Sequence, residues 1–537
     1  MAKIEGAGDI TPKPPNSVVP PTDASVERVT QNVSSISKKI NENTSIEEKS
    51  EKAIPQTAME INVCKETPAA MAMVVYQPPR SLFLKQGENE NTKSLEEEKL
   101  LLDIAAAERQ YLNTYKALHT GGRETSESGL VLSVLTGVNF ERPLLEEIRE
   151  VLSEHFDLSA TPIQSFTLLT KPERRNRVIR ITLKNTETSI IFKESHAVAS
   201  IPSSPPSEKD IADSYSRFTR DCVGLEFTSL LVTESPLCPK YYGGSSEYRF
   251  VLMQDLGKHV SLVDSLVLGT SETAAEASLQ RFMICLGRFH AASYEKTKEY
   301  QAMLHDINPS TNQNNTEELI QNKIIGLKSI CDSFDIPWTN AIEQEAMTAL
   351  QESVNPEGPF CSLLHNDACP DNTFDVPDQL VLIDFEWASI GSALLDATYP
   401  RMNIPSGWCA GAIPEETLLA IENAYRDELK KQIPAATIDT AYDTAYTQAC
   451  ACHILSYTVS LIKEGLEEDF MWGAPDLGWT PTIRPRVLSH LQAFINISER
   501  TSSLPAFKSM TISLLEKLKK EWPEAKSLEL YPAFTKN

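Results

Sequence analysis

Residues 363–386 gather carboxylate and amide side chains in a spacing that suits chemistry on phosphate. His365, Asp367 and Asn372 form the pattern H-x-D-x-x-x-x-N, and a short turn and an apolar run then lead to Asp384. A carboxylate such as Asp367 can orient a hydroxyl nucleophile and accept its proton. Asn372 and Asp384 offer the hard oxygen ligands that Mg²⁺ takes beside phosphates. The spacing therefore predicts phosphoryl transfer, with Asp367 catalytic and Asn372 and Asp384 as metal ligands.

A simpler interpretation treats the same residues as an ordinary surface turn. Pro370, Asp371 and Asn372 are typical turn residues in any protein. The context favours the chemical interpretation, because the apolar run 379–383 is typical of a buried strand. Such a strand would place Asp384 at its end, facing a cleft.

This pattern resembles the aminoglycoside phosphotransferase and choline kinase branch of the protein-kinase-like superfamily. That branch carries H-x-D-x-x-x-x-N followed by an apolar-Asp-apolar-acid run, which Ile383-Asp384-Phe385-Glu386 matches. The resemblance covers roughly residues 159–430. It implies an α+β, two-lobed fold with a small antiparallel-sheet N-lobe and a large helical C-lobe, and it implies ATP and Mg²⁺ as cofactors.

The resemblance also implies a lysine on the third strand, paired with an acid on the next helix. Lys193 follows three apolar residues and fits this place, although a lysine at the end of an edge strand is often only a solubility feature. For its partner, Asp221 matches the family spacing of Arg-Glu and a later aromatic residue, through Arg220 and Phe227. Glu226 is the second candidate, and only one of the two acids can face Lys193.

A further strand around residues 248–253 resembles the hinge of this family, where the backbone contacts adenine. We therefore expect Gln254, Asp255 and Leu256 to bind the nucleotide through their main chain. The connection 170–177 departs from kinases, because no glycine occurs from Thr161 to Leu183. Its Arg and Lys side chains could replace backbone N–H groups as phosphate donors, or the connection could be a solvated basic hairpin.

Other family positions have supporting roles. Asp396 ends a G-x-x-x-x-D pattern and is expected to brace the catalytic loop. His365 is expected to orient that loop, and His290 is expected to be a packed structural residue. The aromatic run 531–534 is expected to dock on the helical lobe.

The elements needed to position these residues follow from the patterns along the chain. Strands are expected near 165–169, 178–183, 189–193 and 248–253, with a helix at 210–231, a loop at 236–244 and mainly helices after Gly257. The expected domains are a disordered tail at 1–93, a helical extension at 94–158, the N-lobe at 159–257 and the C-lobe at 258–537. A helix around 142–155 leads into the N-lobe.

Composition limits the class of protein. Residues 1–75 contain no Phe, Trp or Tyr, so this tail cannot bury enough apolar surface to fold; it could be an inert linker or bind a protein partner. The net charge of −24 argues against nucleic acid and anionic membranes as partners. The ten scattered cysteines and the absence of an apolar leader indicate a cytoplasmic protein.

The sequence predicts a phosphotransferase that moves the γ-phosphate of ATP to a hydroxyl of a small molecule. The family's acceptors include aminoglycosides, choline and sugars, and the sequence does not select among them. One alternative is a catalytically inactive kinase-like nucleotide-binding or scaffold protein. The other is a protein Ser/Thr kinase, which the absence of an Ala-Pro-Glu segment after Glu386 disfavours.

Overall fold

The computed structural model describes residues 61–62, 73–74, 140, 142–170, 175–196, 206–258, 260–309, 316–376 and 379–535. The chain divides into two compact units, residues 1–145 and 146–537. In the first unit, strands β1 (Ile61–Asn62) and β2 (Met73–Val74) pair antiparallel. Apart from these strands, the predicted tail and the part of the helical extension before residue 140 lie outside the described residues.

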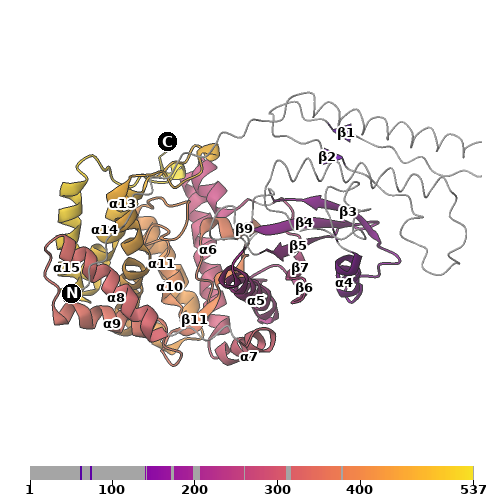
Figure 1. Cartoon of the computed structure of the whole chain (residues 1–537), viewed down its shortest axis with the longest axis horizontal. Helices are drawn as coiled ribbons and strands as arrows, with labels where there is room; N and C mark the ends of the chain where they lie inside the picture. The colour runs from indigo at the N-terminus through magenta and orange to yellow at the C-terminus, as the bar shows by residue number, and fades with distance from the viewer. Residues whose placement is uncertain are drawn as a thin grey trace, which may run out of the picture. The chain divides into compact units, whose positions relative to one another are not determined.

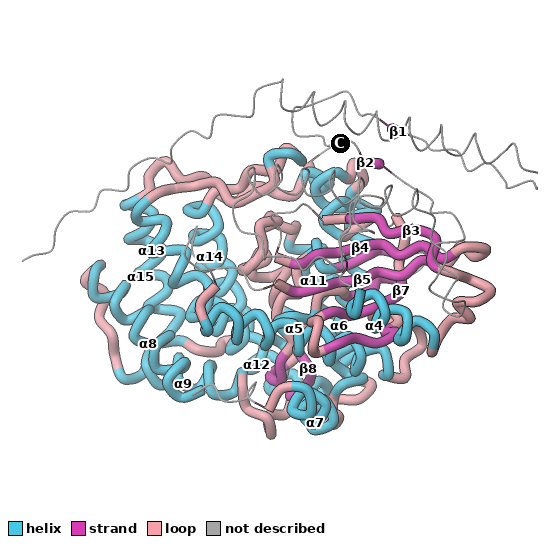
Figure 2. The backbone as a smooth tube through the Cα atoms, turned by 45° about the vertical axis from the view of Figure 1, so that its right-hand side comes forward, coloured by secondary structure: helices cyan, strands magenta, loops and turns pink. Residues whose placement is uncertain are grey.

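A five-stranded antiparallel sheet forms one side of the second unit (Figures 1 and 2). Its strands, in spatial order, are β3 (Ile163–Leu168), β4 (Asn176–Leu183), β5 (Ser189–Ser195), β7 (Phe250–Gln254) and β6 (Tyr241–Ser245). Strand β5 lies at the centre, where Ile190 and Phe192 are fully buried and Lys193 pairs in register with Val251. The central position explains the apolar composition of this strand.

The helical part lies on the other side, with α5 and α6 where the two parts meet (Figure 1). Over all the described residues, in this part and outside it, the helices are α4 (Arg142–Ser153), α5 (Glu208–Leu230), α6 (Glu272–Ser293), α7 (Thr297–Ile307), α8 (Thr316–Ser333), α9 (Asn340–Ser353), α10 (Leu394–Ala397), α11 (Glu415–Leu429), α12 (Asp439–His453), α13 (Val459–Glu467), α14 (Ile483–Thr501) and α15 (Pro505–Glu521). Short 3-10 or π turns are η2 (Asp264–Leu268), η3 (Pro370–Asn372), η4 (Phe385–Trp387), η5 (Pro434–Thr437), η6 (Ile454–Thr458), η7 (Pro475–Leu477) and η8 (Pro532–Phe534).

Two small antiparallel strand pairs position the motif residues within the helical part. Strand β8 (Cys361–Leu364) pairs antiparallel with β11 (Ser389–Ser392), and β9 (Thr373–Val376) pairs antiparallel with β10 (Gln379–Leu382). The loop after β8 carries His365 and Asp367, and the turn after β10 carries Asp384. The two strand pairs thus bring the segment 365–372 close to the turn that carries Asp384.

The architecture confirms the predicted α+β fold of a small antiparallel sheet and a larger helical part. The expected strands near 165, 178, 189 and 248 and the helix at 210–231 are present as β3, β4, β5, β7 and α5. The loop expected at 236–244 is wrong in part, because β6 begins at Tyr241 and joins the sheet edge. The two glycines of Tyr-Tyr-Gly-Gly-Ser hide this strand, since glycine is rare in strands except at bulges, and the register does shift between Tyr241 and Gly243.

The C-terminal segment docks on the helical part as expected. Tyr531 is fully buried, stacks on Trp479 with ring centroids 5.6 Å apart, and donates its hydroxyl proton to the carbonyl of Cys409 at 2.6 Å. Within the described part of the chain, no helix has the length and apolar content needed to cross a membrane.

Candidate active site

Lys193 forms the centre of a buried charge cluster between the sheet and helix α5. Its Nζ lies 2.7 Å from Asp221 Oδ2 on α5 and 2.7 Å from Asp384 Oδ1 in the turn after β10. Asp221 also accepts a hydrogen bond from the backbone N–H of Phe385 at 2.8 Å. Strand, helix and motif turn are therefore joined by two carboxylates and one ammonium group.

Of the two acids considered for the lysine partner, the structure pairs Asp221 with Lys193. Glu226 is half-buried at another point on α5, and its burial raises its pKa. The shorter Asp side chain suffices because α5 approaches the motif turn closely at Gly224. A Cβ atom on Gly224 would lie 2.6 Å from Cβ of Phe385.

The charges in this cluster act strongly on one another. Burial alone would lower the pKa of Lys193, but the negative charges of Asp221, Asp384 and Glu386 outweigh it and raise the pKa above the ordinary value. Burial acts to raise the pKa of Asp384, and the charge of Lys193 outweighs it and holds that pKa below the ordinary value. The ammonium and the Asp384 carboxylate are therefore both charged at neutral pH.

Asp367 and Asn372 lie on one short loop and hold each other. Asn372 Nδ2 donates to Asp367 Oδ2 and to the Asp367 carbonyl, both at 2.9 Å. The turn between them closes through the N–H of Asn372 and the carbonyl of Cys369 at 3.0 Å. Since both amide donor bonds point to Asp367, the Oδ1 atom of Asn372 remains available as an oxygen ligand.

Asp384 approaches Asn372 from the turn after strand β10. The N–H of Ile383 donates to the carbonyl of Asn372 at 3.0 Å, so the two expected metal ligands come from adjacent backbone segments. Asp384 has φ 68° and ψ 64°, a left-handed conformation that Asp tolerates better than most residues.

The donor set fits Mg²⁺ held together with phosphates. Among the described residues, no group of three or more His, Cys, Asp or Glu side chains could hold a metal ion by itself. Asn372 and Asp384 supply two hard oxygen donors, which is the small protein share that Mg²⁺ takes when phosphates and water complete its shell.

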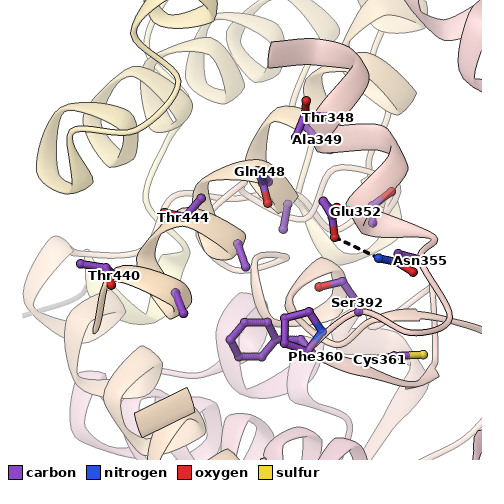
Figure 3. Close-up of a pocket in the computed structure, with 16 residues that line it drawn as sticks. Thr348, Ala349, Glu352, Asn355, Phe360, Cys361, Ser392, Thr440, Thr444 and Gln448 are labelled. Atoms are coloured by element: carbon purple, nitrogen blue, oxygen red, sulfur yellow. Dashed lines mark hydrogen bonds between the residues drawn. The ribbon is translucent and has the colours of Figure 1, made fainter. Parts of the chain in front are cut away.

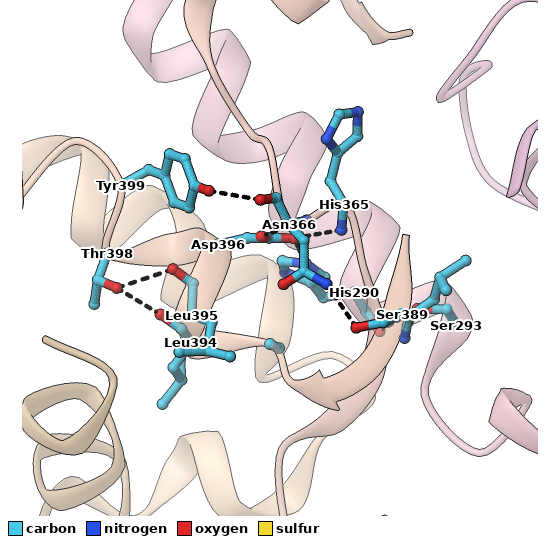
Figure 4. A network of polar contacts seen from close by, with 12 residues as sticks. His290, Ser293, His365, Asn366, Ser389, Leu394, Leu395, Asp396, Thr398 and Tyr399 are labelled. Carbon is cyan, nitrogen blue, oxygen red and sulfur yellow. Dashed lines mark hydrogen bonds and ion pairs between the residues drawn. The ribbon is translucent and has the colours of Figure 1, made fainter. Parts of the chain in front are cut away.

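Asp396 holds the backbone of the loop after β8 in place (Figure 4). Its carboxylate accepts the backbone N–H of His365 at 2.6 Å and that of Asn366 at 2.9 Å. His290 Nε2 lies 3.2 Å from the same carboxylate, and its Nδ1 lies 2.8 Å from the Tyr425 hydroxyl. The packed environment expected for His290 is confirmed, since its side chain is fully buried.

Gln254, Asp255 and Leu256, the three expected adenine contacts, differ in whether their backbone N–H group already has a partner. The N–H of Gln254 donates to the carbonyl of Lys240 at 2.9 Å, and the N–H of Asp255 donates to that of Ser189 at 3.3 Å. The Asp255 side chain is bound to Arg180 and to Ser189. Within the described residues, the N–H of Leu256 has no backbone partner, so it is the donor of the three that a base could use.

The glycine-free connection between β3 and β4 reaches across to the motif turn. Arg175 forms an ion pair with Glu386, which is buried two residues after Asp384. The Nε atom of Arg175 is buried and lacks a hydrogen-bond partner among the described residues. A donor of the basic hairpin therefore lies beside the acidic motif, whereas residues 171–174 lie outside the described residues.

Sequence reasoning did not find every group that contacts Asp367. Ser406 Oγ donates to Asp367 Oδ1 at 3.0 Å, and the thiol of Cys369 donates to the same atom at 3.1 Å. Asp371 accepts from Trp408 Nε1 at 2.7 Å, and burial raises its pKa. Cys369 lies inside the quoted motif, but nothing in the sequence marks Ser406, which joins the loop only through the fold.

A separate pocket of about 510 Å³ opens between α9 and α12, away from these groups (Figure 3). Hydroxyl and amide side chains such as Thr348, Ser392, Thr444 and Gln448 line it, and Glu352 bonds Asn355 at 3.2 Å beside it. None of the expected site residues lines this pocket.

Comparison with known proteins finds a family match for part of the chain. Residues 224–429 match the model of the phosphotransferase enzyme family. An ethanolamine kinase from Plasmodium vivax is 11% identical, with 79% of this chain and 98% of that chain covered and a TM-score of 0.38. A choline/ethanolamine kinase family protein from Mesorhizobium loti is 9% identical (69% and 99% covered, TM-score 0.35).

The structure of the GDP complex of aminoglycoside 2'-phosphotransferase-IIIa gives similar values, with 15% identity, coverage of 70% and 98%, and a TM-score of 0.34. Among curated protein sequences, none matches this chain. The resemblance predicted from the motif is confirmed by the family model, whose matched residues include Asp367, Asn372 and Asp384.

Proposed function

We propose that this chain, whose residues 224–429 match the phosphotransferase enzyme family, transfers the γ-phosphate of ATP to a hydroxyl group of a small molecule with the aid of Mg²⁺. The observation that carries this proposal is the meeting of two groups of side chains. Lys193 lies 2.7 Å from both Asp221 and Asp384, and the Asn372–Asp367 bond closes the catalytic loop beside them at 2.9 Å. Phosphoryl transfer needs charge neutralisation and an in-line nucleophile, and these groups can supply both.

Each residue has one task in the proposed reaction. Asp367 orients the acceptor hydroxyl and takes its proton, and Asp396 keeps the loop in position. Asn372 and Asp384 would hold Mg²⁺, which neutralises phosphate charge when it is bound. Lys193 contacts the phosphates, and Asp221 fixes the lysine through their ion pair.

The nucleotide is proposed to bind with its base at the hinge and its phosphates at the charge cluster. The N–H of Leu256 is the free donor of the hinge segment 254–256, and it supports binding of a purine base there. The buried Nε of Arg175 supports a contact to phosphate, which would replace the backbone donors of a glycine-rich loop.

The proposal is tested by incubating the protein with ATP, Mg²⁺ and a pooled small-molecule extract, and by searching for a product that gains one phosphoryl group by mass spectrometry. A chelator-treated sample is the control, and GTP replaces ATP in a parallel sample to identify the donor. A product that requires Mg²⁺ and nucleotide supports the reaction and identifies its acceptor. The absence of any product, together with the absence of ATP binding in calorimetry, would refute the proposal.

A further inference from the structure

The loop after α10 places a hydroxyl group on the proposed catalytic base. Ser406 Oγ lies 3.0 Å from Asp367 Oδ1, although the two residues are 39 positions apart in the chain. Asn372 Nδ2 occupies the other oxygen, Oδ2, at 2.9 Å. The carboxylate is therefore held at both ends by donors from different segments.

The proton of Ser406 has three acceptors within reach, and one of them is the sulfur of Cys369 at 3.5 Å. Besides Asp367, the hydroxyl oxygen of Tyr399 lies 3.3 Å away. Tyr399 itself donates to the carbonyl of Asn366 at 2.6 Å. A hydroxyl has one proton, and a hydrogen bond to a carboxylate is stronger than one to a neutral acceptor. Ser406 therefore donates its hydrogen bond to Asp367.

Helix α14 clamps the loop that carries Ser406. The guanidinium group of Arg486 is fully buried and donates from Nη2 to the carbonyls of Ile404 at 3.3 Å and Gly407 at 2.7 Å, on either side of Ser406. It also stacks on Trp472, with 4.2 Å between Cζ and the ring centroid. A charged group buried against two carbonyls fixes the backbone around Ser406.

The backbone of the loop before Ser406 is strained at two residues, which indicates that the position of this loop matters. Asn403 and Ile404 have φ values of 54° and 56°, and a β-branched residue is strained there. Asn403 Nδ2 donates to Ser489 Oγ of α14 at 2.8 Å, which gives the helix a second hold on the loop. Strained backbone that its surroundings fix in this way occurs where position matters.

We propose that Ser406 is a positioning residue for phosphoryl transfer. It fixes Oδ1 of Asp367 while Asn372 fixes Oδ2, so the carboxylate cannot turn about its side-chain bond when an acceptor hydroxyl arrives. The inference rests on the proposed function, because it concerns the geometry of the same reaction. Without Ser406, the thiol of Cys369 alone holds Oδ1, and a thiol is a weak donor.

The test compares Ser406→Ala with wild type in steady-state transfer from ATP to the acceptor that the extract experiment identifies. The expected result is a fall in kcat of about tenfold to a hundredfold, as for a lost bond to a charged group, with the KM for ATP within about twofold. Ser406→Thr keeps the hydroxyl and is expected to restore most of kcat. Ser513→Ala removes an exposed helix hydroxyl that bonds only the backbone of α15, and it is the matched control.

The outcomes separate this inference from the proposed function. An active wild type with unchanged kcat in Ser406→Ala, or no recovery in Ser406→Thr, overturns the inference alone. A wild type that binds ATP and transfers no phosphate overturns the proposed function, and the positioning role is lost with it. If Ser406→Ala shows no thermal unfolding transition, and is therefore not folded, Ser406→Cys replaces it. The thiol is a weaker donor of similar size and should give an intermediate kcat.

Discussion

Lys193 is the residue on which the charge balance of the site depends. Its ammonium group is the buried cation between Asp221 and Asp384, at 2.7 Å from each. Removing a buried cation leaves two carboxylates uncompensated, which costs more than the pair contributes when intact. The same ammonium is the group proposed to contact the nucleotide phosphates.

Lys193→Met is therefore expected to weaken ATP binding by about tenfold or more, since a charge-assisted contact is lost. Glu226→Gln is the control, because Glu226 is half-buried on α5, the helix that carries Asp221, and is the acid that Lys193 does not pair with. Isothermal calorimetry with ATP and Mg²⁺ measures both variants. Equal ATP affinity in Lys193→Met and wild type would remove this lysine from the proposed site.

The sequence predicts single residues where a local pattern fixes their neighbours. Asp367 and Asn372 lie between β8 and β9, Asp384 lies in the turn after β10, and their spacing predicted that they would meet. Ser406 and Arg486 could not be found in this way, because their contacts with the loop are made between distant segments. A serine in a loop and an arginine in a helix have no local signature for such contacts.

At the level of elements, the connection between β3 and β4 contains no glycine, whereas protein kinases cover the phosphates with a glycine-rich loop. Arg175 directly precedes β4 and forms an ion pair with Glu386. The sequence left two interpretations of this connection open, a phosphate donor or a solvated hairpin. The contact favours the phosphate donor, because Glu386 is buried beside the expected metal ligand Asp384.

Arg175→Ala is expected to raise the KM for ATP by about tenfold, because it removes a charged donor from the phosphate end of the site. Arg149→Ala, an exposed arginine of helix α4, is the control for loss of one positive charge. Steady-state kinetics at varied ATP measures the effect. An unchanged KM would favour the solvated-hairpin interpretation.

Helix α5 depends on a close approach that only glycine allows. In Gly224→Ala the new Cβ would lie 2.6 Å from Phe385 Cβ, so α5 must shift and carry Asp221 with it. We expect a loss of about 1–3 kcal/mol in the free energy of unfolding. Gly326→Ala is the matched helix control, because its nearest neighbour, Val459 Cγ1, is 3.3 Å away.

Urea unfolding of both glycine variants measures this difference. Equal stability of Gly224→Ala and Gly326→Ala would contradict the packing described for α5. The sequence predicted the helix at 210–231, and the structure begins α5 at Glu208, where Ser207 caps the helix together with Asp210. The close approach at Gly224 was not predictable, because it depends on a residue 161 positions later in the printed sequence.

At the level of the whole molecule, buried histidines couple the stability of the fold to pH. His453 on α12 is buried, and its Nε2 lies 2.9 Å from the carbonyl of Leu395 near the Asp396 brace. Burial lowers the pKa of His453 to about 4, against the opposing effects of the Leu395 hydrogen bond and the charge of Asp396. The unfolded chain therefore binds a proton between pH 6.5 and about 4 that the folded chain does not.

Stability should accordingly be complete above pH 6.5 and fall as the pH drops toward 4, by roughly 3 kcal/mol from this group. His453→Gln is expected to flatten that fall, since glutamine does not titrate and can still donate to Leu395. His305→Gln changes an exposed histidine on α7 and should leave the profile unchanged. Urea unfolding at a series of pH values gives the comparison, and parallel profiles for His453→Gln and wild type would contradict it.

The central claim is that Asp367 directs transfer of the γ-phosphate to a hydroxyl acceptor. The direct measurement follows label from γ-labelled ATP into acceptor for wild type and Asp367→Asn at saturating ATP and Mg²⁺. Asparagine keeps the size of the side chain but cannot accept the proton, so we expect the rate to fall by about a hundredfold to ten-thousandfold with ATP affinity retained. A variant that transfers label as fast as wild type would contradict the claim.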